Sequence, residues 1–257
     1  MAVSISILGA SGYGAAELMR RFLPDPGVNV IRASSRDDVG RTVAQAHPSL
    51  GSFGHDLVIE DLSPSEAAHG ADLVFLGLPH AVSMKVIPEL METGVKIIDL
   101  SGDFRLQDPA QYAAYYGLPH AAPELLSRFV YGLPELFREA IAGASYVASP
   151  GCFATSQILA MAPLARRGWL EGEARVVSVT GSSGSGARPG LGTHHPVRSV
   201  NLKAYKALRH QHTPEIVQAL RHAGSRNLRL DFVPVSAPIS RGILTTALVD
   251  LPPGVEA

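Results

Sequence analysis

The sequence is short of cysteine, of excess charge of either sign, and of long apolar runs. It has one cysteine in 257 residues, so it cannot form an internal disulfide, which is typical of a chain that folds in a reducing compartment. Its 22 Lys and Arg balance 23 Asp and Glu, which leaves no basic field for nucleic acid or an anionic membrane. No apolar run reaches membrane-spanning length, and no signal peptide precedes the first strand pattern. We therefore expect a soluble cytoplasmic protein without nucleic-acid or membrane partners.

The first half of the chain alternates short apolar runs with helical patterns, as parallel α/β folds do. Strands are expected at 3–8, 28–33, 71–78, 95–100 and 146–148, with helices after the first strand and over 82–92. Beyond the cysteine, strands at 174–180, 228–235 and 242–251 are separated by long loops and one helix at 214–222. The predicted fold class is α/β: a Rossmann-type parallel-sheet domain at 1–151 and an α+β domain with a mixed or antiparallel sheet at 152–257.

A glycine-rich turn, Gly9-Ala-Ser-Gly-Tyr-Gly-Ala15, separates the first strand from the first helix. Small residues at 9, 12 and 15 allow backbone N–H groups to face a pyrophosphate at the start of the helix. A purely structural turn is the alternative, and the flanking strand and helix favour dinucleotide binding. The predicted cofactor contacts here are Gly9, Ser11, Gly12, Tyr13 and Gly14.

The residues after the second strand distinguish between the two dinucleotides. An NAD site usually has a carboxylate here for the ribose 2′-hydroxyl, whereas a 2′-phosphate calls for Arg and hydroxyl groups. Ser34, Ser35 and Arg36 come first, and Asp37 and Asp38 follow them. We therefore predict NADP; the alternative is an exposed loop in which Arg36 pairs with one of the two aspartates.

The single cysteine, Cys152, follows Pro150-Gly151 and precedes a helical pattern at 154–167. A thiol in the first turn of a helix lies near the positive end of the helix dipole, which favours the nucleophilic thiolate. A lone cysteine is more often a small buried apolar residue, so its context has to decide between the two interpretations. The predicted domain boundary at 151–152 is a common place for a ligand site.

A second polar motif contains His210, His212, Thr213, Pro214 and Glu215. Thr213 is predicted to be a helix N-cap, Pro214 the first helical residue, and Glu215 a first-turn carboxylate. That structural interpretation leaves both histidines unexplained. A thiolate nucleophile needs a proton acceptor and donor, which histidine supplies, and a carboxylate can orient the histidine. Metal binding would compete for these groups, but the spacing fits no usual zinc pattern, and no metal is predicted.

A polar loop at 181–188 is rich in Gly and Ser and carries Arg188. It either presents N–H groups and this cation to an anion such as phosphate, or forms a mobile hairpin.

These motifs occur together in one known family. The chain resembles N-acetyl-γ-glutamyl-phosphate reductase and its close relative that reduces an aminoadipyl phosphate in lysine biosynthesis. The matching motifs follow the family order from residue 5 to residue 243: Gly9-Ala-Ser-Gly-Tyr13, Leu78-Pro-His80, Asp99-Leu-Ser-Gly-Asp-Phe-Arg105, Tyr131-Gly-Leu-Pro-Glu135, Pro150-Gly-Cys152, Gly192-Thr-His194, His210-Gln-His-Thr-Pro-Glu215 and Pro238-Ile-Ser-Arg-Gly242.

The resemblance implies a fold of the semialdehyde-dehydrogenase type and an enzyme that acts through a cysteine. Cys152 would attack the acyl phosphate, release phosphate and leave a thioester, which NADPH would reduce to the semialdehyde. His210 and His212 match the family's histidine pair, of which either can move the proton, and Glu215 matches the linked carboxylate. Further implied contacts are Pro79, Ser183 and Gly184 for the cofactor, and Arg105, Arg188, His194, His195 and Arg198 for the substrate.

Three departures from the family pattern bear on the substrate and the cofactor site. Phe153-Ala154 replaces the usual Tyr-Pro after the cysteine, and His194-His195 is more similar to the aminoadipyl branch, whose substrate hangs from an acidic carrier protein. Family members also extend beyond the length of this chain, so we expect either a fragment or a less enclosed cofactor site. The expected substrate is N-acetyl-γ-glutamyl phosphate, in arginine biosynthesis; the alternative is the carrier-linked acyl phosphate. A homo-oligomer is also expected.

Three other activities compete with this interpretation. A cysteine hydrolase would use Cys152, a histidine and Glu215, but would leave the glycine-rich turn without a purpose. A non-catalytic nucleotide-binding protein would bind NADPH and do no chemistry. The sibling aspartate-semialdehyde activity would require turnover of aspartyl phosphate.

Overall fold

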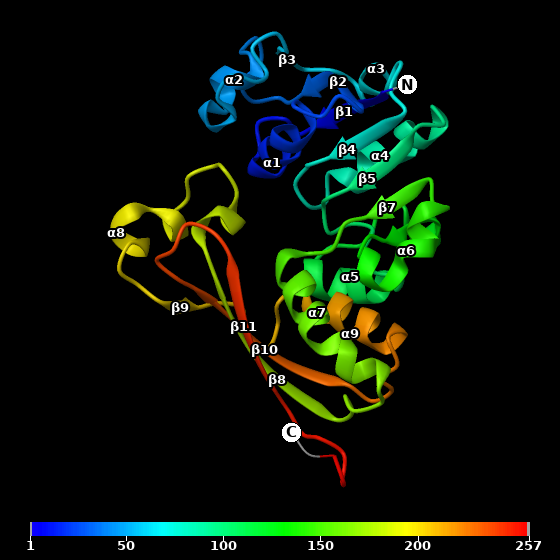
Figure 1. The fold of residues 1–257 in the computed structure, drawn as a ribbon, viewed down its shortest axis with the longest axis vertical. Coiled ribbons are helices and arrows are strands. Elements are labelled where there is room, and N and C mark those ends of the chain that lie inside the picture. Colours follow the sequence, from blue (N-terminus) through cyan, green and yellow to red (C-terminus); the bar gives the residue numbers. More distant parts are fainter. Residues whose placement is uncertain (1, 256–257) are drawn as a thin grey trace. The chain divides into compact units, whose positions relative to one another are not determined.

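The computed structural model describes residues 2–255, which form two compact units (Figure 1). Among the described residues, the first unit comprises 2–107, His120–Gly132 and Phe137–Ser149. The second comprises Asp108–Pro119, Leu133–Leu136 and 150–255, so it takes two short segments from the first half of the chain.

The first unit contains a seven-stranded sheet in which every strand pair is parallel, in the order β3-β2-β1-β4-β5-β7-β6. Its strands are β1 (Val3–Leu8), β2 (Val28–Ser34), β3 (Ile59–Glu60), β4 (Leu73–Leu76), β5 (Lys96–Asp99), β6 (Val130–Tyr131) and β7 (Tyr146–Ala148). The connecting helices include α1 (Tyr13–Phe22), α2 (Val43–Ala46), η1 (Pro48–Leu50), α3 (Pro64–Ala68), α4 (Ser83–Glu92) and η2 (Pro123–Arg128). α6 (Pro134–Ala142) is kinked at Phe137; its residues before the kink belong to the second unit and the rest to the first.

Burial explains why the central strands of this sheet are apolar almost throughout. Ile5 and Ile7 in β1 and Val74 and Leu76 in β4 are buried, because helices cover the sheet, and Met19 of α1 belongs to the same core. The chain forms β1, β2 and β3 in one direction across the sheet and then returns to place β4 on the other side of β1. This reversal is the topological switch point at which open α/β sheets bind ligands, beyond the carboxyl ends of the strands.

The second unit contains a four-stranded mixed sheet in the order β11-β8-β10-β9. β8 (Glu173–Thr180) pairs in parallel with β10 (Arg229–Ser236), whereas β9 (Lys203–Ala204) and β11 (Ile243–Val249) pair antiparallel with their neighbours. α7 (Cys152–Arg166) and α9 (Thr213–His222) cover one face of this sheet (Figure 1). The remaining elements are α5 (Pro109–Tyr116), η3 (Ser182–Ser185), η4 (Leu191–Thr193) and α8 (His195–Arg198).

The other face of this mixed sheet is uncovered within the described chain and carries both apolar side chains and, toward the start of β8 and β10, the ion-paired Glu173, Arg175, Arg229 and Asp231. Residues alternate along β8, so that Val176 is buried on the helix side while Val177, on the opposite side, is 45% exposed. Leu244 and Leu248 of β11 share that open face and are 68% and 65% exposed. Large exposed side chains on one sheet face mark an interaction surface.

The predicted fold class is confirmed, including the mixed sheet of the second unit. β1 and β7 have the predicted bounds, whereas β4 is four residues shorter than the predicted strand at 71–78. Within residues 2–255, no helix is long and apolar enough to cross a membrane.

Candidate functional site

Cys152 is the first residue of α7, and Gly151 is the N-cap of that helix in an extended conformation. No side chain caps this end of the helix, so the positive end of a 15-residue helix dipole acts on the thiol. The cysteine is exposed, although Phe153 and Ala154 beside it are buried. The interpretation of Cys152 as a buried apolar residue is therefore wrong, and the prediction that it is a nucleophile agrees with an exposed thiol at a helix start.

His212 and Glu215 both lie against Gly151, the residue before the cysteine. The N–H of Gly151 donates to Oε2 of Glu215 at 3.2 Å, and Oε1 of the same carboxylate lies 3.8 Å from Nε2 of His212. A Cβ at position 151 would lie 2.5 Å from Nε2 of His212 and 2.6 Å from Oε1 of Glu215. Only glycine fits there, so the structure brings the cysteine turn, an imidazole and a carboxylate together.

His210 is more deeply buried than His212 and packs among aromatic side chains. It is 3% exposed, and its ring packs edge-on against Phe153 and Phe232, with centroids 5.2 and 5.4 Å away. Its Nδ1 accepts the backbone N–H of His212 at 3.1 Å. Burial lowers the pKa of His210 to about 3, and the neighbouring charge of His212 adds to this effect. His210 is therefore neutral at physiological pH and holds the backbone of His212 in place.

Tyr205 is a site residue that the sequence interpretation missed. Burial raises its pKa to about 12, and the negative charge of a Cys152 thiolate adds to the shift, so the phenol lies near the thiol and stays protonated. It follows β9, and its ring centroid lies 6.0 Å from that of His210. Tyr205 is a single tyrosine in a loop and is not part of a sequence motif, so no sequence pattern could have identified it.

The prediction that Thr213 caps α9 is wrong. The N-cap is His212, Thr213 is the first helical residue, and the buried Thr213 hydroxyl has no hydrogen-bond partner among the described residues. His212 occupies the cap with helical backbone angles, φ −82° and ψ −11°, while its ring lies over Gly151. Packing at the site therefore overrides the capping preference of threonine.

The glycine-rich turn lies at the switch point of the parallel sheet. Gly9 has φ +84°, and a Cβ there would lie 2.4 Å from the carbonyl oxygen of Gly77, just after β4. α1 begins at Tyr13 with Gly12 as its N-cap, and no side chain caps it. An uncapped helix start beside a close glycine contact fits a bound pyrophosphate, so these residues suit a dinucleotide.

The three residues after β2 differ in their availability to a cofactor. The Ser34 hydroxyl is buried and accepts the N–H of Leu62, and Ser35 shares a hydrogen bond of 2.8 Å with Ser11 of the glycine-rich turn. Arg36 is exposed. Asp38, one of the two aspartates considered as ion-pair partners of Arg36, instead pairs with Arg41. Arg36 is therefore the group best placed to meet a 2′-phosphate, and the direct contacts of Ser34 and Ser35 remain predictions.

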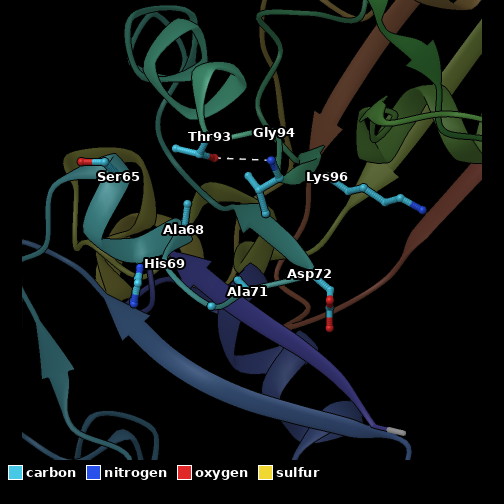
Figure 2. A pocket seen from close by; sticks show the side chains of 10 residues that line it. Ser65, Ala68, His69, Ala71, Asp72, Thr93, Gly94 and Lys96 are labelled. Atoms are coloured by element: carbon cyan, nitrogen blue, oxygen red, sulfur yellow. Dashed lines mark hydrogen bonds between the residues drawn. The ribbon is translucent and has the colours of Figure 1, made fainter.

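A cavity of about 510 Å³ in the first unit lies away from the glycine-rich turn. Figure 2 shows its lining, which comes from α3, from residues before β4 such as Ala71 and Asp72, and from the start of β5 at Lys96. The cavity is at the amino-terminal edge of the strands, and the turn follows their carboxyl-terminal edge. None of the predicted site residues lines it.

The comparisons with known proteins agree with this arrangement. Residues 4–144 match the model of the semialdehyde dehydrogenase NAD-binding domain, and residues 152–257 match that of the semialdehyde dehydrogenase dimerisation domain. The chain belongs to the semialdehyde dehydrogenase family. The resemblance inferred from the motifs is thereby confirmed.

Two relatives in this family carry the names that the motifs suggested. The N-acetyl-γ-glutamyl-phosphate reductase of Magnetococcus marinus is 42% identical over 98% of this chain and 72% of its own length. The [LysW]-L-2-aminoadipate/[LysW]-L-glutamate phosphate reductase of Sulfurisphaera tokodaii is 40% identical over 95% of this chain and 70% of its own length. An aspartate semialdehyde dehydrogenase from Candida albicans, solved with NADP, shares the fold, with 11% identity and a TM-score of 0.69 over 100% of this chain and 73% of that one.

Two arginines that the resemblance assigns to substrate binding contact backbone carbonyls in this chain. Arg105 is buried and donates from Nε to the carbonyl of Ser149 at 2.7 Å and from Nη2 to that of Leu100 at 2.8 Å. Arg198 is buried and donates to the carbonyls of Ala237 and Thr180 at 2.9 and 3.1 Å. Both side chains join separate segments of their unit, and their contact with substrate remains a prediction.

The other residues predicted at the substrate and cofactor follow β8, except for Pro79. Backbone N–H groups of Gly181, Ser182 and Ser183 donate to Gly242, Ile239 and Ser240, which anchors the start of the Gly/Ser loop to the Pro238–Gly242 motif. Gly184, Arg188, His194 and His195 are exposed farther along this connection, and Pro79 follows β4 in the first unit. Their predicted contacts are not decided by the geometry.

Proposed function

We propose that the protein is an NADPH-dependent reductase of an acyl phosphate, which converts N-acetyl-γ-glutamyl phosphate to N-acetyl-glutamate semialdehyde and phosphate. The observation that carries the proposal is the position of His212 and Glu215 against Gly151, next to an exposed thiol at a helix start. The names of the 40–42% identical relatives support the substrate class. The uncapped start of α1 and the exposed Arg36 support NADP.

Cys152 is the nucleophile in the proposed mechanism. Its thiolate attacks the acyl carbon, a C–S bond forms, the C–O bond to the phosphate breaks, and inorganic phosphate leaves. Bound NADPH supplies the hydride that the resulting thioester needs to become an aldehyde. The residues that would hold the cofactor are those of the turn at 9–14 and Arg36.

His212 is the proposed proton-transfer residue. Its Nε2 faces the cysteine turn and the Glu215 carboxylate, which stabilises the charged imidazolium. A proton from this nitrogen neutralises the oxygen that becomes negative at the acyl carbon, and the same nitrogen takes that proton back when the C–S bond breaks, which releases the aldehyde and restores the Cys152 thiolate. His210, which is neutral down to about pH 3, acts as a positioning residue through its bond to the His212 backbone.

The carrier-linked acyl phosphate is a second candidate substrate, and one stretch of the chain favours it. Residues 174–214 contain no Asp or Glu and six Arg or Lys, of which Arg198 is buried and Arg175 pairs with Glu173, and the other four lie between residues 188 and 209. Exposed apolar side chains lie among these charges, with Leu191 92% exposed and Val200 88% exposed. A cationic segment with apolar contacts suits an acidic protein partner, since charge complementarity steers such an association.

The open face of the mixed sheet is the proposed contact between two copies of the chain. The match of residues 152–257 to a dimerisation domain and the exposed Leu244 and Leu248 support this assignment. A reactive thiol that must stay reduced also supports a cytoplasmic location.

The direct test offers the purified protein each acyl phosphate in turn and follows the loss of NADPH absorbance. Turnover of N-acetyl-γ-glutamyl phosphate supports the proposal, and turnover of only the carrier-linked compound supports the second candidate. Turnover of only aspartyl phosphate, or continuous hydrolysis of an acyl phosphate beyond one equivalent per site without NADPH, would contradict both. NADPH binding without turnover of any of the three would leave a nucleotide-binding protein.

A further inference from the structure

One buried histidine outside the catalytic cluster contacts the glycine-rich turn. Nε2 of His47 lies 2.7 Å from the carbonyl oxygen of Ala10, the residue between Gly9 and Ser11. His47 is 7% exposed, and Ala10 is fully buried. Both belong to the first unit, so this contact is internal to one compact body.

The segment around His47 is built to hold this ring in place. Thr42 and Gln45 form a capping box that starts α2, and His47 ends α2 and begins η1. Val43 and Leu50, on either side of the histidine, pack in the same core cluster as Ala10. The imidazole therefore reaches the turn from a rigid support 37 residues along the chain.

Fixing the carbonyl of Ala10 also fixes the next N–H. A trans peptide is planar, and its C=O and N–H point in opposite directions, so a carbonyl held toward His47 directs the N–H of Ser11 away from it. The N–H groups of Gly9 and Ala10 are used inside the fold, because both donate to the carbonyl of Ser34 at 2.8 and 2.9 Å. The N–H of Ser11 is thus the one that this contact directs outward at the start of α1.

We propose that His47 is a positioning residue for dinucleotide binding: it sets the orientation of the Ala10–Ser11 peptide, so that the Ser11 N–H meets an anionic group of the cofactor at the uncapped start of α1. Without this donor, the buried Ala10 carbonyl would lose its partner, and rotation of the peptide would relieve that cost. The rotated peptide would present a carbonyl oxygen to the anion. Both the neutral Nε2–H tautomer and the imidazolium donate to a carbonyl, so the contact does not depend on the charge of the ring.

The test compares three variants at position 47 with a control. His47→Leu is of similar size and removes the donor. The side-chain amide of His47→Gln places its N–H about as far from the backbone as Nε2 of the histidine. The amide of the shorter His47→Asn extends only as far as Nδ1. His55→Gln is the matched control, because His55 is exposed and lies in the same connection between α2 and β3. Nicotinamide fluorescence gives the Kd of NADPH, and steady-state kinetics gives KM and kcat.

His47→Leu is expected to raise both the Kd and the KM of NADPH by about tenfold or more, with little change in kcat at saturating NADPH or in the KM of the acyl phosphate. His47→Gln should recover most of the affinity, His47→Asn should not, and His55→Gln should match the wild type. If His47→Leu does not fold, the contrast between Gln and Asn decides. Equal NADPH affinity in the Gln and Asn variants, or wild-type affinity in the Leu variant, would overturn the inference.

The inference rests on the proposed use of NADPH, and the two can fail separately. If the wild-type protein does not bind NADPH, the proposed function is wrong and the role of His47 is wrong with it. If the wild type binds NADPH and every position-47 variant that folds binds equally well, the proposed function stands and only the positioning role is lost.

Discussion

Nε2 of His212 and Oε1 of Glu215 lie 3.8 Å apart, and both would contact a side chain at Gly151, if there were one. The other oxygen of the carboxylate holds the N–H of Gly151, so one buried acid contacts both the imidazole and the turn before Cys152. The account of catalysis depends on this spacing, because an imidazole must reach the reacting atoms to transfer a proton.

Gly151→Ala tests the spacing directly. The backbone of Gly151, at φ −66° and ψ 152°, is open to alanine, so the whole effect should come from a Cβ 2.5 Å from His212. We expect kcat/KM to fall by about 100-fold, because small displacements of catalytic groups are that costly. Gly143→Ala is the matched control, since the nearest atom to its new Cβ is 4.0 Å away. Equal activity of both variants would contradict the geometry.

Substitutions of the two histidines should separate their roles. His212→Asn removes the proposed proton-transfer group and is expected to lower kcat by about 10²–10⁴-fold. His210→Asn keeps an acceptor near the position of Nδ1 for the His212 N–H and should cost much less. The pH–rate profile supplies the check: the limb assigned to His212 should persist in His210→Asn and vanish in His212→Asn. Loss of that limb in His210→Asn alone would reverse the assignment.

The buried state of His210 makes the stability of the fold depend on pH. Its folded pKa of about 3 lies below the unfolded value of about 6.5, so the unfolded chain binds the proton that the folded chain excludes. The free energy of unfolding should therefore fall as pH drops below about 6.5, by up to about 1.4 kcal/mol per pH unit from this group, until pH approaches 3. Urea denaturation of the wild type and His210→Asn between pH 4.5 and 8 measures the effect. The wild type should lose its advantage in unfolding free energy over His210→Asn as the pH falls. A difference in unfolding free energy that stays constant with pH would contradict the low folded pKa of His210.

The open sheet face should determine the oligomeric state. Leu244→Asp and Val177→Asp place charges in the apolar part of that face, where Leu244 lies opposite Val179, and burial of each side chain contributes about 1.5–3 kcal/mol. Light scattering with size exclusion should show dimers of the wild type and monomers of the double variant. Leu191→Asp, on an exposed residue outside the sheet, is the control and should leave the dimer intact. A dimeric double variant would place the contact elsewhere.

The sequence predicted the positions of strands and helices correctly where hydrophobic periodicity and the spacing of turn residues indicate them. β1 and β7 and the start of α7 beside Cys152 followed from apolar runs and a Pro-Gly turn. The two-residue strands β3 and β6 could not be predicted, because two residues have no periodicity. The contact of His47 with Ala10 depends on how segments far apart in the sequence meet, which only the folded chain determines.

The catalytic motif shows the same division. Its residue types led to the prediction of Cys152, the histidine pair and Glu215 as site residues, whereas their arrangement in space depends on packing: His210 packs against Phe153 and Phe232, and His212 faces the cysteine turn. Thr213 was assigned to the cap by local preference, and the ring of His212 over Gly151 overrode it.

The most direct test of the account is a single-turnover experiment with the acyl phosphate in the absence of NADPH. The account predicts a burst of close to one equivalent of phosphate per site and a mass increase on Cys152 equal to the acyl group. Later addition of NADPH should release the semialdehyde, and Cys152→Ala should show no burst. Semialdehyde formation at an undiminished rate by Cys152→Ala, or phosphate release only after NADPH is added, would contradict the covalent route.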